Sequence, residues 1–148
     1  MRTAPYPGFA TDNMPMLMAI LTKAKGISQI EETIFSNRYM AAPELVRMGA
    51  SISIKGNKAI IIGKEKLYGA ECISSDLRTT FSIILGAIGA VGTSQVARVF
   101  HGFRGYYNLE KKLKKVGVKI RRITLLMKRR YLAKIIAKDN QGLQLISA

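Results

Sequence analysis

The sequence predicts an α/β protein made of two copies of one unit of about 65 residues. Two observations support this prediction. The same set of landmark residues occurs once in each half of the chain at a nearly constant offset, and each copy alternates amphipathic helical segments with short strands rich in β-branched residues. The 148 residues are 48% hydrophobic and 22% charged, which is the composition of a folded domain and excludes a disordered chain.

The repeat is defined by an aspartate, a Ser-Gln pair, a phenylalanine, an arginine and a glycine. From the first copy to the second, these landmarks are separated by 64, 66, 65, 66 and 68 residues: Asp12 and Asp76, Ser28 and Ser94, Phe35 and Phe100, Arg38 and Arg104, Gly49 and Gly117. A spacing this regular over five landmarks is unexpected by chance.

In the first copy we expect a helix at 13–24, because Asp12 is suited to its N-cap and apolar residues follow at helical spacing. Pro15 falls in the first turn, where a missing N–H costs nothing, and Gly26 ends the helix. A strand at 27–35 and a second helix at 40–48 are expected next. Strands at 50–54 and 58–62 then form a hairpin that turns at Gly56-Asn57.

The second copy predicts the same order. Residues 68–74 form a strand leading into it, and Asp76 caps a helix that Gly92 follows. A strand, a helix and a strand are then expected at 93–100, 106–116 and 118–123. We therefore divide the chain into a repeat domain at 1–120, with repeats at about 11–55 and 75–120, and a tail at 121–148.

Positive charge is concentrated at the end of the chain. The net charge is +15, and residues 101–148 hold 13 of the 24 basic residues but only two of the nine acidic ones. The tail combines Arg121-Arg122 and a basic run at 128–130 with leucines and isoleucines. Such a segment is compatible with an anionic membrane surface, with nucleic acid, or with a solvated extension that binds nothing. We expect no nucleic-acid partner, and a membrane contact is the less favoured alternative.

Single reactive residues exclude several kinds of site. Cys72 is the one cysteine, so no internal disulfide forms, and with the single His101 it gives no zinc-binding set. Cys72 lies in an apolar strand and is expected to be a buried, inert thiol, whereas His101 is expected to make a local hydrogen bond. The N-terminus has no signal-peptide pattern and no apolar stretch is long enough to span a bilayer, so we expect a cytoplasmic protein.

The repeated acidic and basic residues suggest an anion site. Arg38 and Arg104 follow the ends of equivalent strands, and Arg78 lies at the start of the helix that Asp76 caps. Helix N-termini and arginines both favour phosphate or carboxylate groups. The alternative is that these residues are only helix caps and surface arginines, and their spacing alone leaves both interpretations open.

Longer motifs resemble a known family. The segments Thr3-Ala-Pro-Tyr-Pro-Gly-Phe-Ala-Thr-Asp12, Glu32-Thr-Ile-Phe-Ser-Asn-Arg-Tyr39 and Ser75-Asp-Leu-Arg78, with Pro43–Ala50 and Arg104–Tyr106, resemble the UDP-N-acetylglucosamine 1-carboxyvinyltransferases of the enolpyruvyl transferase family. The resemblance extends to about Ile120 and corresponds to the later part of one of the two domains of such an enzyme.

The resemblance implies an inside-out α/β fold of βαβαββ repeats, here incomplete, with about two repeats plus the tail. It also implies transfer of the enolpyruvyl group of phosphoenolpyruvate to the 3-hydroxyl of UDP-N-acetylglucosamine, the first committed step of peptidoglycan synthesis, with no cofactor and no metal. Asp12 matches the carboxylate that holds and deprotonates that hydroxyl, and Ile34 matches a residue that contacts the UDP-sugar through its backbone. Substrate-facing charged residues of the family are matched by Arg38, Asp76, Arg78 and Arg104.

The chain departs from the family in three places. Asn13–Met16 replaces glutamines, Phe103 stands where an acidic residue is usual, and the tail after Ile120 shows no resemblance. The family's catalytic cysteine and its phosphoenolpyruvate-binding lysine lie upstream of anything that matches Met1. We therefore expect a truncated fragment that is inactive alone, or one half of a split enzyme whose other domain is a separate chain. The alternatives are a UDP-sugar-binding module without turnover and a protein whose basic tail binds a membrane or nucleic acid.

Overall fold

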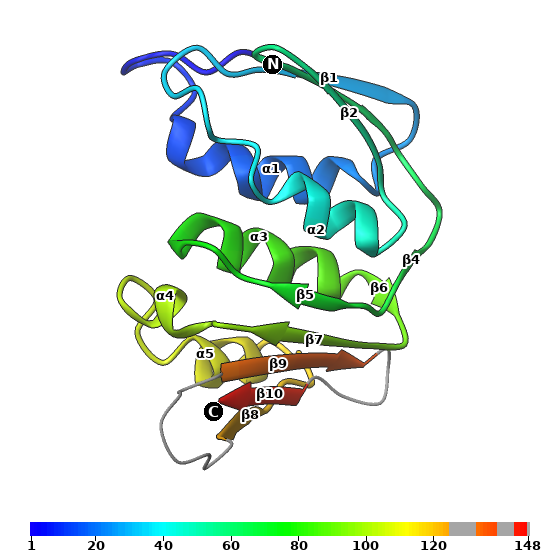
Figure 1. Cartoon of the computed structure of the whole chain (residues 1–148), viewed down its shortest axis with the longest axis vertical. Helices are drawn as coiled ribbons and strands as arrows, with labels where there is room; N and C mark the ends of the chain where they lie inside the picture. Colours follow the sequence, from blue (N-terminus) through cyan, green and yellow to red (C-terminus); the bar gives the residue numbers. More distant parts are fainter. Residues whose placement is uncertain (125–132, 139–143, 148) are drawn as a thin grey trace.

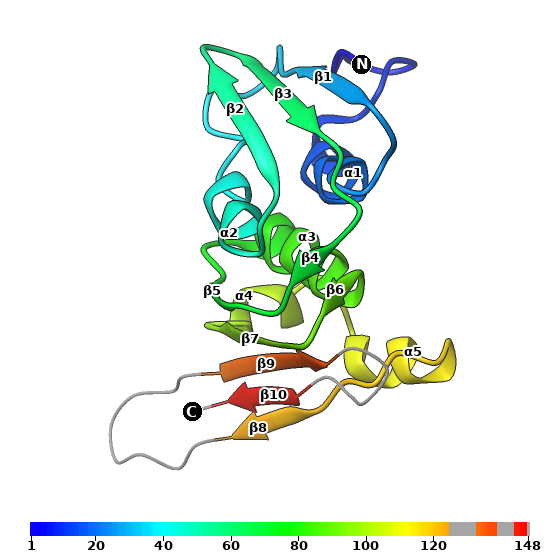
Figure 2. The same cartoon turned by 90° about the vertical axis from the view of Figure 1, so that its right-hand side faces the viewer.

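Helices α1, α2 and α3 lie between two small β-sheets in a computed structural model of the chain, which describes residues 1–124, 133–138 and 144–147 (Figures 1 and 2). The arrangement confirms the predicted α/β class. Each helix buries one face against a sheet and another against a neighbouring helix, so the helices form the interior and the sheets the outer layers.

The first unit contains the hairpin that the sequence predicts. Its elements are a 3-10 turn at Thr11–Asn13, α1 at Met14–Leu21, β1 at Ile27–Glu31, α2 at Ala42–Arg47, β2 at Ser51–Lys55 and β3 at Lys58–Ile62. The sheet has the order β1-β3-β2, and both pairings are antiparallel. Because β2 and β3 turn at Gly56-Asn57, β3 returns into the centre of this sheet.

The second unit follows a short parallel pair, β4 at Leu67–Tyr68 with β6 at Ala90–Val91. Its elements are β5 at Glu71–Ile73, α3 at Leu77–Ile88, β7 at Thr93–Ala97, α4 at Phe100–Phe103, α5 at Leu109–Lys115, β8 at Arg122–Thr124, β9 at Ala133–Lys138 and β10 at Gln144–Ser147. Their sheet has the order β10-β8-β9-β7-β5.

The two units share one topology. The order β1-β3-β2 in the first corresponds to β7-β9-β8 in the second, with antiparallel pairing in both. In the second unit β5 adds a parallel strand beside β7. In the first, Arg2 makes a parallel bridge to Glu31, and Thr3 N–H donates to the Glu31 carbonyl at 2.9 Å. Both units therefore follow the order βαβαββ, with the isolated bridge of Arg2 in place of the leading strand in the first unit. The sequence pattern did not predict this pairing, because Met1–Thr3 has no alternating apolar pattern.

Glycines with positive φ occur at equivalent points of the two units. Gly26 and Gly92 precede the strands β1 and β7 with φ of 88° and 91°. Gly49 and Gly117 follow the helices α2 and α5 with φ of 91° and 87°. Residues with a side chain rarely adopt this left-handed conformation, so both units need glycine before these strands and after these helices.

Strands β8, β9 and β10 fall in the segment predicted to be a separate basic tail. Thr93 to Ala97 of β7 pair with Lys138 to Lys134 of β9, so β9 covers the whole length of β7. This part of the tail is built into the sheet of the second unit. The predicted basic run at 128–130 lies outside the described residues.

The core is centred on the contact between α1 and α3. Met14 and Met18 of α1 and Ile83 and Ile84 of α3 are fully buried. Gly86 permits α2 to approach α3, because a Cβ added there would lie 2.7 Å from Leu45 Cδ2. None of the helices in the described part of the chain is long and apolar enough to cross a membrane.

Candidate functional site

Asp12 lies where the starts of α1 and α3 meet. The sequence predicted an N-cap at this position, which is wrong: Asp12 lies inside the 3-10 turn, and Asn13 occupies the cap position of α1. Neither the 3-10 turn nor α1 has a side-chain cap. Asp12 Oδ1 accepts a hydrogen bond from Arg78 Nε at 2.7 Å and lies 3.2 Å from an Nη atom of Arg38. The carboxylate is therefore held by two arginines from different parts of the chain.

Asp76 is the helix cap that the sequence predicted. Its Oδ1 accepts from the backbone N–H groups of Arg78 and Thr79 at 2.9 and 3.0 Å, and its Oδ2 accepts from the hydroxyls of Ser75 and Thr79. Because these four donors surround the carboxylate, the direct effect of Asp76 is to fix the first turn of α3. That turn carries Arg78 toward Asp12.

Arg38 reaches Asp12 from the loop after β1. Its side chain is 14% exposed, against 56% for Asp12, and its guanidinium lies over the Phe35 ring with Cζ 4.4 Å from the centroid. Arg38 Nε also donates to Thr11 Oγ1 at 3.1 Å. The ring and the hydroxyl together fix the direction of the guanidinium.

Glu32 is buried and holds the same loop in place through hydrogen bonds. It is 3% exposed, and its carboxylate accepts from the hydroxyls of Thr3 and Thr11 and from the backbone N–H groups of Ile34 and Phe35. Ile34 is thereby fixed in position, with its side chain partly exposed and its N–H already engaged. Its carbonyl is the backbone group that could still meet a ligand.

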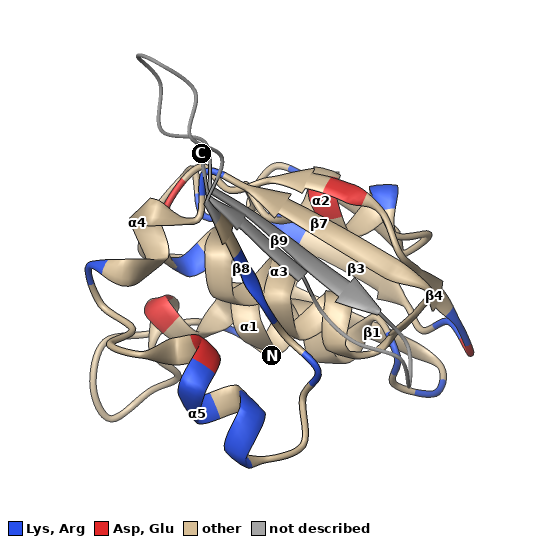
Figure 3. Cartoon of the chain, turned by 90° about the horizontal axis from the view of Figure 1, so that it is seen from below, with Lys and Arg blue, Asp and Glu red and all other residues tan. Residues whose placement is uncertain are grey.

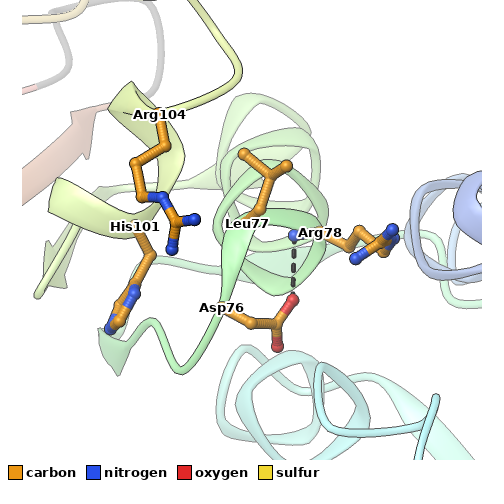
Figure 4. A pocket seen from close by; sticks show the side chains of 5 residues that line it. All are labelled: Asp76, Leu77, Arg78, His101 and Arg104. Atoms are coloured by element: carbon orange, nitrogen blue, oxygen red, sulfur yellow. Dashed lines mark hydrogen bonds between the residues drawn. The ribbon is translucent and has the colours of Figure 1, made fainter.

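Arg104 lies in a pocket of about 350 Å³ lined by Asp76, Leu77, Arg78, His101 and Arg104. Figure 4 shows Arg104 and His101 on one side of Leu77, while the Arg78 side chain extends from the other side toward the N-terminal segment. A second pocket of about 190 Å³ lies on the Arg38 side, and Asp76 and Arg78 line both. Arg78 thus lines both pockets, one of which also contains Arg104 and the other Arg38.

The electrostatics keep the carboxylates charged. The hydrogen bond from Arg78 is the main reason that the pKa of Asp12 is lowered, and the charge of Arg38 adds to it. Burial raises the pKa of Glu32, but its four hydrogen bonds outweigh that effect and the pKa is lowered. Ionised acids beside cationic arginines give a site that offers both an acceptor for a hydroxyl and donors for an anion.

Of the six residues predicted from sequence, the structure brings Asp12, Arg38 and Arg78 into direct contact. Arg104 shares a pocket with Arg78, Asp76 acts through the helix that it caps, and Ile34 lies on the loop that carries Arg38. Sequence reasoning missed Thr11 and Glu32. Their signal was present in the quoted motifs, but a threonine and a glutamate 21 residues apart give no sign of a shared hydrogen bond.

His101 and Cys72 have different outcomes. His101 was expected to make a local hydrogen bond, yet its Nε2 is buried without a hydrogen-bond partner among the described residues. Its ring packs against Phe100 with centroids 4.1 Å apart. Cys72 is buried as predicted, and burial together with the nearby Glu44 raises the pKa of its thiol to about 12.

Solved structures with this fold are enolpyruvyl transferases. The enolpyruvyl transferase NikO from Streptomyces tendae matches 93% of this chain and 29% of its own length with a TM-score of 0.71 at 23% identity. An EPSP synthase from Acinetobacter baumannii matches 90% of this chain and 29% of its own length with a TM-score of 0.63 at 19% identity. These likenesses establish the fold.

The family profile of EPSP synthase (3-phosphoshikimate 1-carboxyvinyltransferase) matches residues 1–113, and the chain belongs to this family. Curated relatives named UDP-N-acetylglucosamine 1-carboxyvinyltransferase are 52% identical over 121 residues in Zymomonas mobilis and 52% identical over 122 residues in Pelagibacter ubique. Each comparison covers 82% of this chain but only 28% and 29% of the relative. These relatives confirm the resemblance seen in the motifs, and the chain spans under a third of their length.

Proposed function

We propose that this chain forms one wall of the active site of a UDP-N-acetylglucosamine 1-carboxyvinyltransferase. The wall serves transfer of the enolpyruvyl group from phosphoenolpyruvate to the 3-hydroxyl of the UDP-sugar in peptidoglycan synthesis, which we place in the cytoplasm. The single observation that carries the proposal is the Asp12 carboxylate held between Arg38 and Arg78, next to the pocket that contains Arg104.

The chemistry of the cluster suits these substrates. The Asp12 carboxylate is 56% exposed and can accept a hydrogen bond from a sugar hydroxyl. Because its pKa is lowered, it is a weak base that orients the hydroxyl and takes the proton only as the new C–O bond develops. Arg38, Arg78 and Arg104 would bind the phosphate and carboxylate of phosphoenolpyruvate and stabilise negative charge during transfer. Asp76 supports this role by holding the turn that carries Arg78.

We further propose that these 148 residues bind substrate without turnover. A thiol that donates or accepts a proton near neutral pH needs exposure and a lowered pKa, whereas Cys72 is 1% exposed and its pKa is raised to about 12. The proton donor and the opposite wall of the site would come from another domain, in the same polypeptide or in a partner chain.

Calorimetric titration of the chain with UDP-N-acetylglucosamine, combined with a phosphate-release assay after addition of phosphoenolpyruvate, tests the proposal. We expect binding that Asp12→Ala weakens by roughly tenfold, the usual effect of one lost hydrogen bond to a charged group. Arg47→Lys is the control, because Arg47 is exposed and pairs with Glu44 away from the site. Equal binding by Asp12→Ala and wild type would contradict the proposed role of Asp12. Phosphate release that Asp12→Ala abolishes would contradict the proposal that turnover needs another domain.

A second candidate function is electrostatic binding of a polyanion by α5 and the segment before β8. Seven basic side chains are exposed between 111 and 122, and Glu110 is the acid beside them, as the blue and red segments of α5 show in Figure 3. Binding of a 20-mer oligonucleotide should fall steeply with added salt if this surface acts in that way. Replacing Lys111, Lys112, Lys114 and Lys115 by glutamine should then abolish binding, and salt-independent binding would exclude this function.

A further inference from the structure

Glu32 and Thr11 form a partly buried connection next to the proposed site. The Thr11 hydroxyl donates to Glu32 Oε2 at 2.8 Å and accepts from Arg38 Nε at 3.1 Å. Arg38 in turn lies 3.2 Å from Asp12 Oδ1. Two hydrogen bonds and one ion pair therefore connect a buried carboxylate with the exposed one.

The direction of each hydrogen bond in this connection is fixed. An ionised carboxylate can only accept, so the single hydroxyl proton of Thr11 must point toward Glu32. The lone pairs of Thr11 Oγ1 are then free for the N–H of Arg38, which can only donate. Glu32 stays ionised because four donors surround it and lower its pKa.

The other carboxylate oxygen of Glu32 accepts hydrogen bonds that hold the loop. Oε1 accepts from Thr3 Oγ1 at 2.9 Å and from the backbone N–H groups of Ile34 and Phe35 at 2.7 and 3.1 Å. Phe35 carries the ring on which the Arg38 guanidinium lies. Both oxygens of one carboxylate thus support Arg38, one through the loop and the other through Thr11.

We propose that Glu32 is a positioning residue for the substrate site, and that it acts by orienting the Thr11 hydroxyl so that Arg38 is held against Asp12. This inference rests on the proposed function for its role in substrate binding, but the positioning itself is a property of the chain alone. In the part of the chain that the structure describes, Glu32 makes no hydrogen bond or ion pair with Asp12 or Arg78, so its effect reaches the site through Thr11 and the loop.

The variant Glu32→Gln reverses the polarity of the connection. The three donors on Oε1 require the amide oxygen at that place, which puts the amide NH₂ at the position of Oε2. The amide then donates to one lone pair of Thr11 Oγ1, and the hydroxyl proton, which no longer has the carboxylate as its acceptor, is free to turn to the position that faces Arg38 Nε–H. Shape and size are kept, while the orientation of the hydroxyl that accepts from Arg38 is no longer fixed.

Thr11→Val and Thr11→Ser form a matched pair at the centre of the connection. Valine keeps the branched shape of threonine and removes the hydroxyl, whereas serine keeps the hydroxyl. Arg78 provides an internal reference, because its Nε donates directly to Asp12 and not through Thr11.

The measurement is NMR of the arginine Nε–H groups in the 148-residue chain, with the Arg38 signal identified by its loss in Arg38→Lys. We expect a protected Arg38 signal in wild type and in Thr11→Ser. In Thr11→Val and Glu32→Gln its exchange with water should speed up on the order of tenfold, which corresponds to loss of one hydrogen bond to a charged donor. The Arg78 signal should remain in all variants, and circular dichroism should show that each is folded.

Three results would overturn the proposal: an Arg38 signal that stays protected in Thr11→Val or Glu32→Gln, loss of that signal in Thr11→Ser, or joint loss of the Arg38 and Arg78 signals. Titration with UDP-N-acetylglucosamine gives a separate answer on function. If wild type binds, Thr11→Val should bind more weakly and Thr11→Ser should bind as wild type does. If wild type does not bind, the proposed function fails while the NMR result still decides whether Glu32 positions Arg38.

Discussion

Arg78 Nε lies 2.7 Å from Asp12 Oδ1, although the two residues are 66 positions apart in the sequence. That separation is close to the repeat length, so the bond joins the start of the first unit to the start of the second. Packing of α1 against α3 in the core brings these two starts together, with the Ser82 hydroxyl donating to the Pro15 carbonyl between the helices. The site is a product of the contact between repeats and is absent from either repeat alone.

The pH dependence of stability should reflect the site. The pKa of Asp12 is lower in the folded chain than its ordinary value, mainly through the Arg78 hydrogen bond. Its contribution is therefore complete above the unfolded-state pKa of about 4 and is lost as the pH falls through the lower folded-state value. We expect the loss of stability from pH 5 to pH 2, measured by urea unfolding, to be smaller in Asp12→Asn than in wild type. Glu65→Gln removes an exposed acid outside the site and is the control. Identical pH profiles for wild type and Asp12→Asn would contradict the ion pairs described here.

Removing the cap of α3 should destabilise the chain. Asp76→Ala leaves the backbone N–H groups of Arg78 and Thr79 without their side-chain acceptor, at a cost of about 1–2 kcal/mol in the free energy of unfolding. Asp76→Ser retains an acceptor and should recover most of that loss. Equilibrium urea unfolding at pH 7 measures both variants. The assignment of Asp76 as a cap fails if alanine and serine have the same effect.

Gly86 and Gly89 offer a matched test of helix packing. A Cβ at Gly86 would lie 2.7 Å from Leu45 Cδ2 and 3.2 Å from Met48 Sδ in the buried contact between α2 and α3. We expect Gly86→Ala to cost about 1–3 kcal/mol in unfolding free energy through overpacking. A Cβ at Gly89 meets chiefly the flexible Lys23 side chain at 3.1 Å, so Gly89→Ala should be nearly neutral. Thermal unfolding of both variants distinguishes them. An unchanged unfolding temperature for Gly86→Ala would show that α2 can move away from α3 at little cost in stability.

The thiol of Cys72 should be unreactive in the folded chain. It is 1% exposed, and burial raises its pKa to about 12, so almost no thiolate exists at pH 8. A chromogenic disulfide reagent should label it only after unfolding in urea. Rapid labelling of the native chain at pH 8 would show that β5 opens readily.

Truncation after residue 120 should destabilise the second sheet. Strand β9 pairs with β7 along its whole length, so deletion of 121–148 exposes the edge of β7 and removes the strands next to it. We expect a large drop in the unfolding temperature. Replacing Arg121 by glutamine is the control, because it removes charge from the same segment without removing a strand. Unchanged stability on truncation would mean that 121–148 contributes nothing to the sheet.

Local pattern was sufficient to predict most elements of this chain. The repeat, the left-handed glycines after the helices, the Gly56-Asn57 hairpin and the Asp76 cap are all properties of residues close together in sequence, where propensity and hydrogen-bonding geometry decide the outcome. The candidate site was assembled from longer motifs and from the resemblance that they carry.

Asp12 shows what the sequence by itself could not determine. It has the same residue type and the same place before a helix as Asp76, yet Asp76 caps its helix while Asp12 binds Arg78 and Arg38. The difference arises from long-range neighbours, because Arg78 of α3 and Arg38 of the loop after β1 hold the Asp12 carboxylate, which makes no bond to the N–H groups of α1. Sequence thus determined the repeated unit and its elements, whereas the packing of one unit on the other decided which charged residues meet.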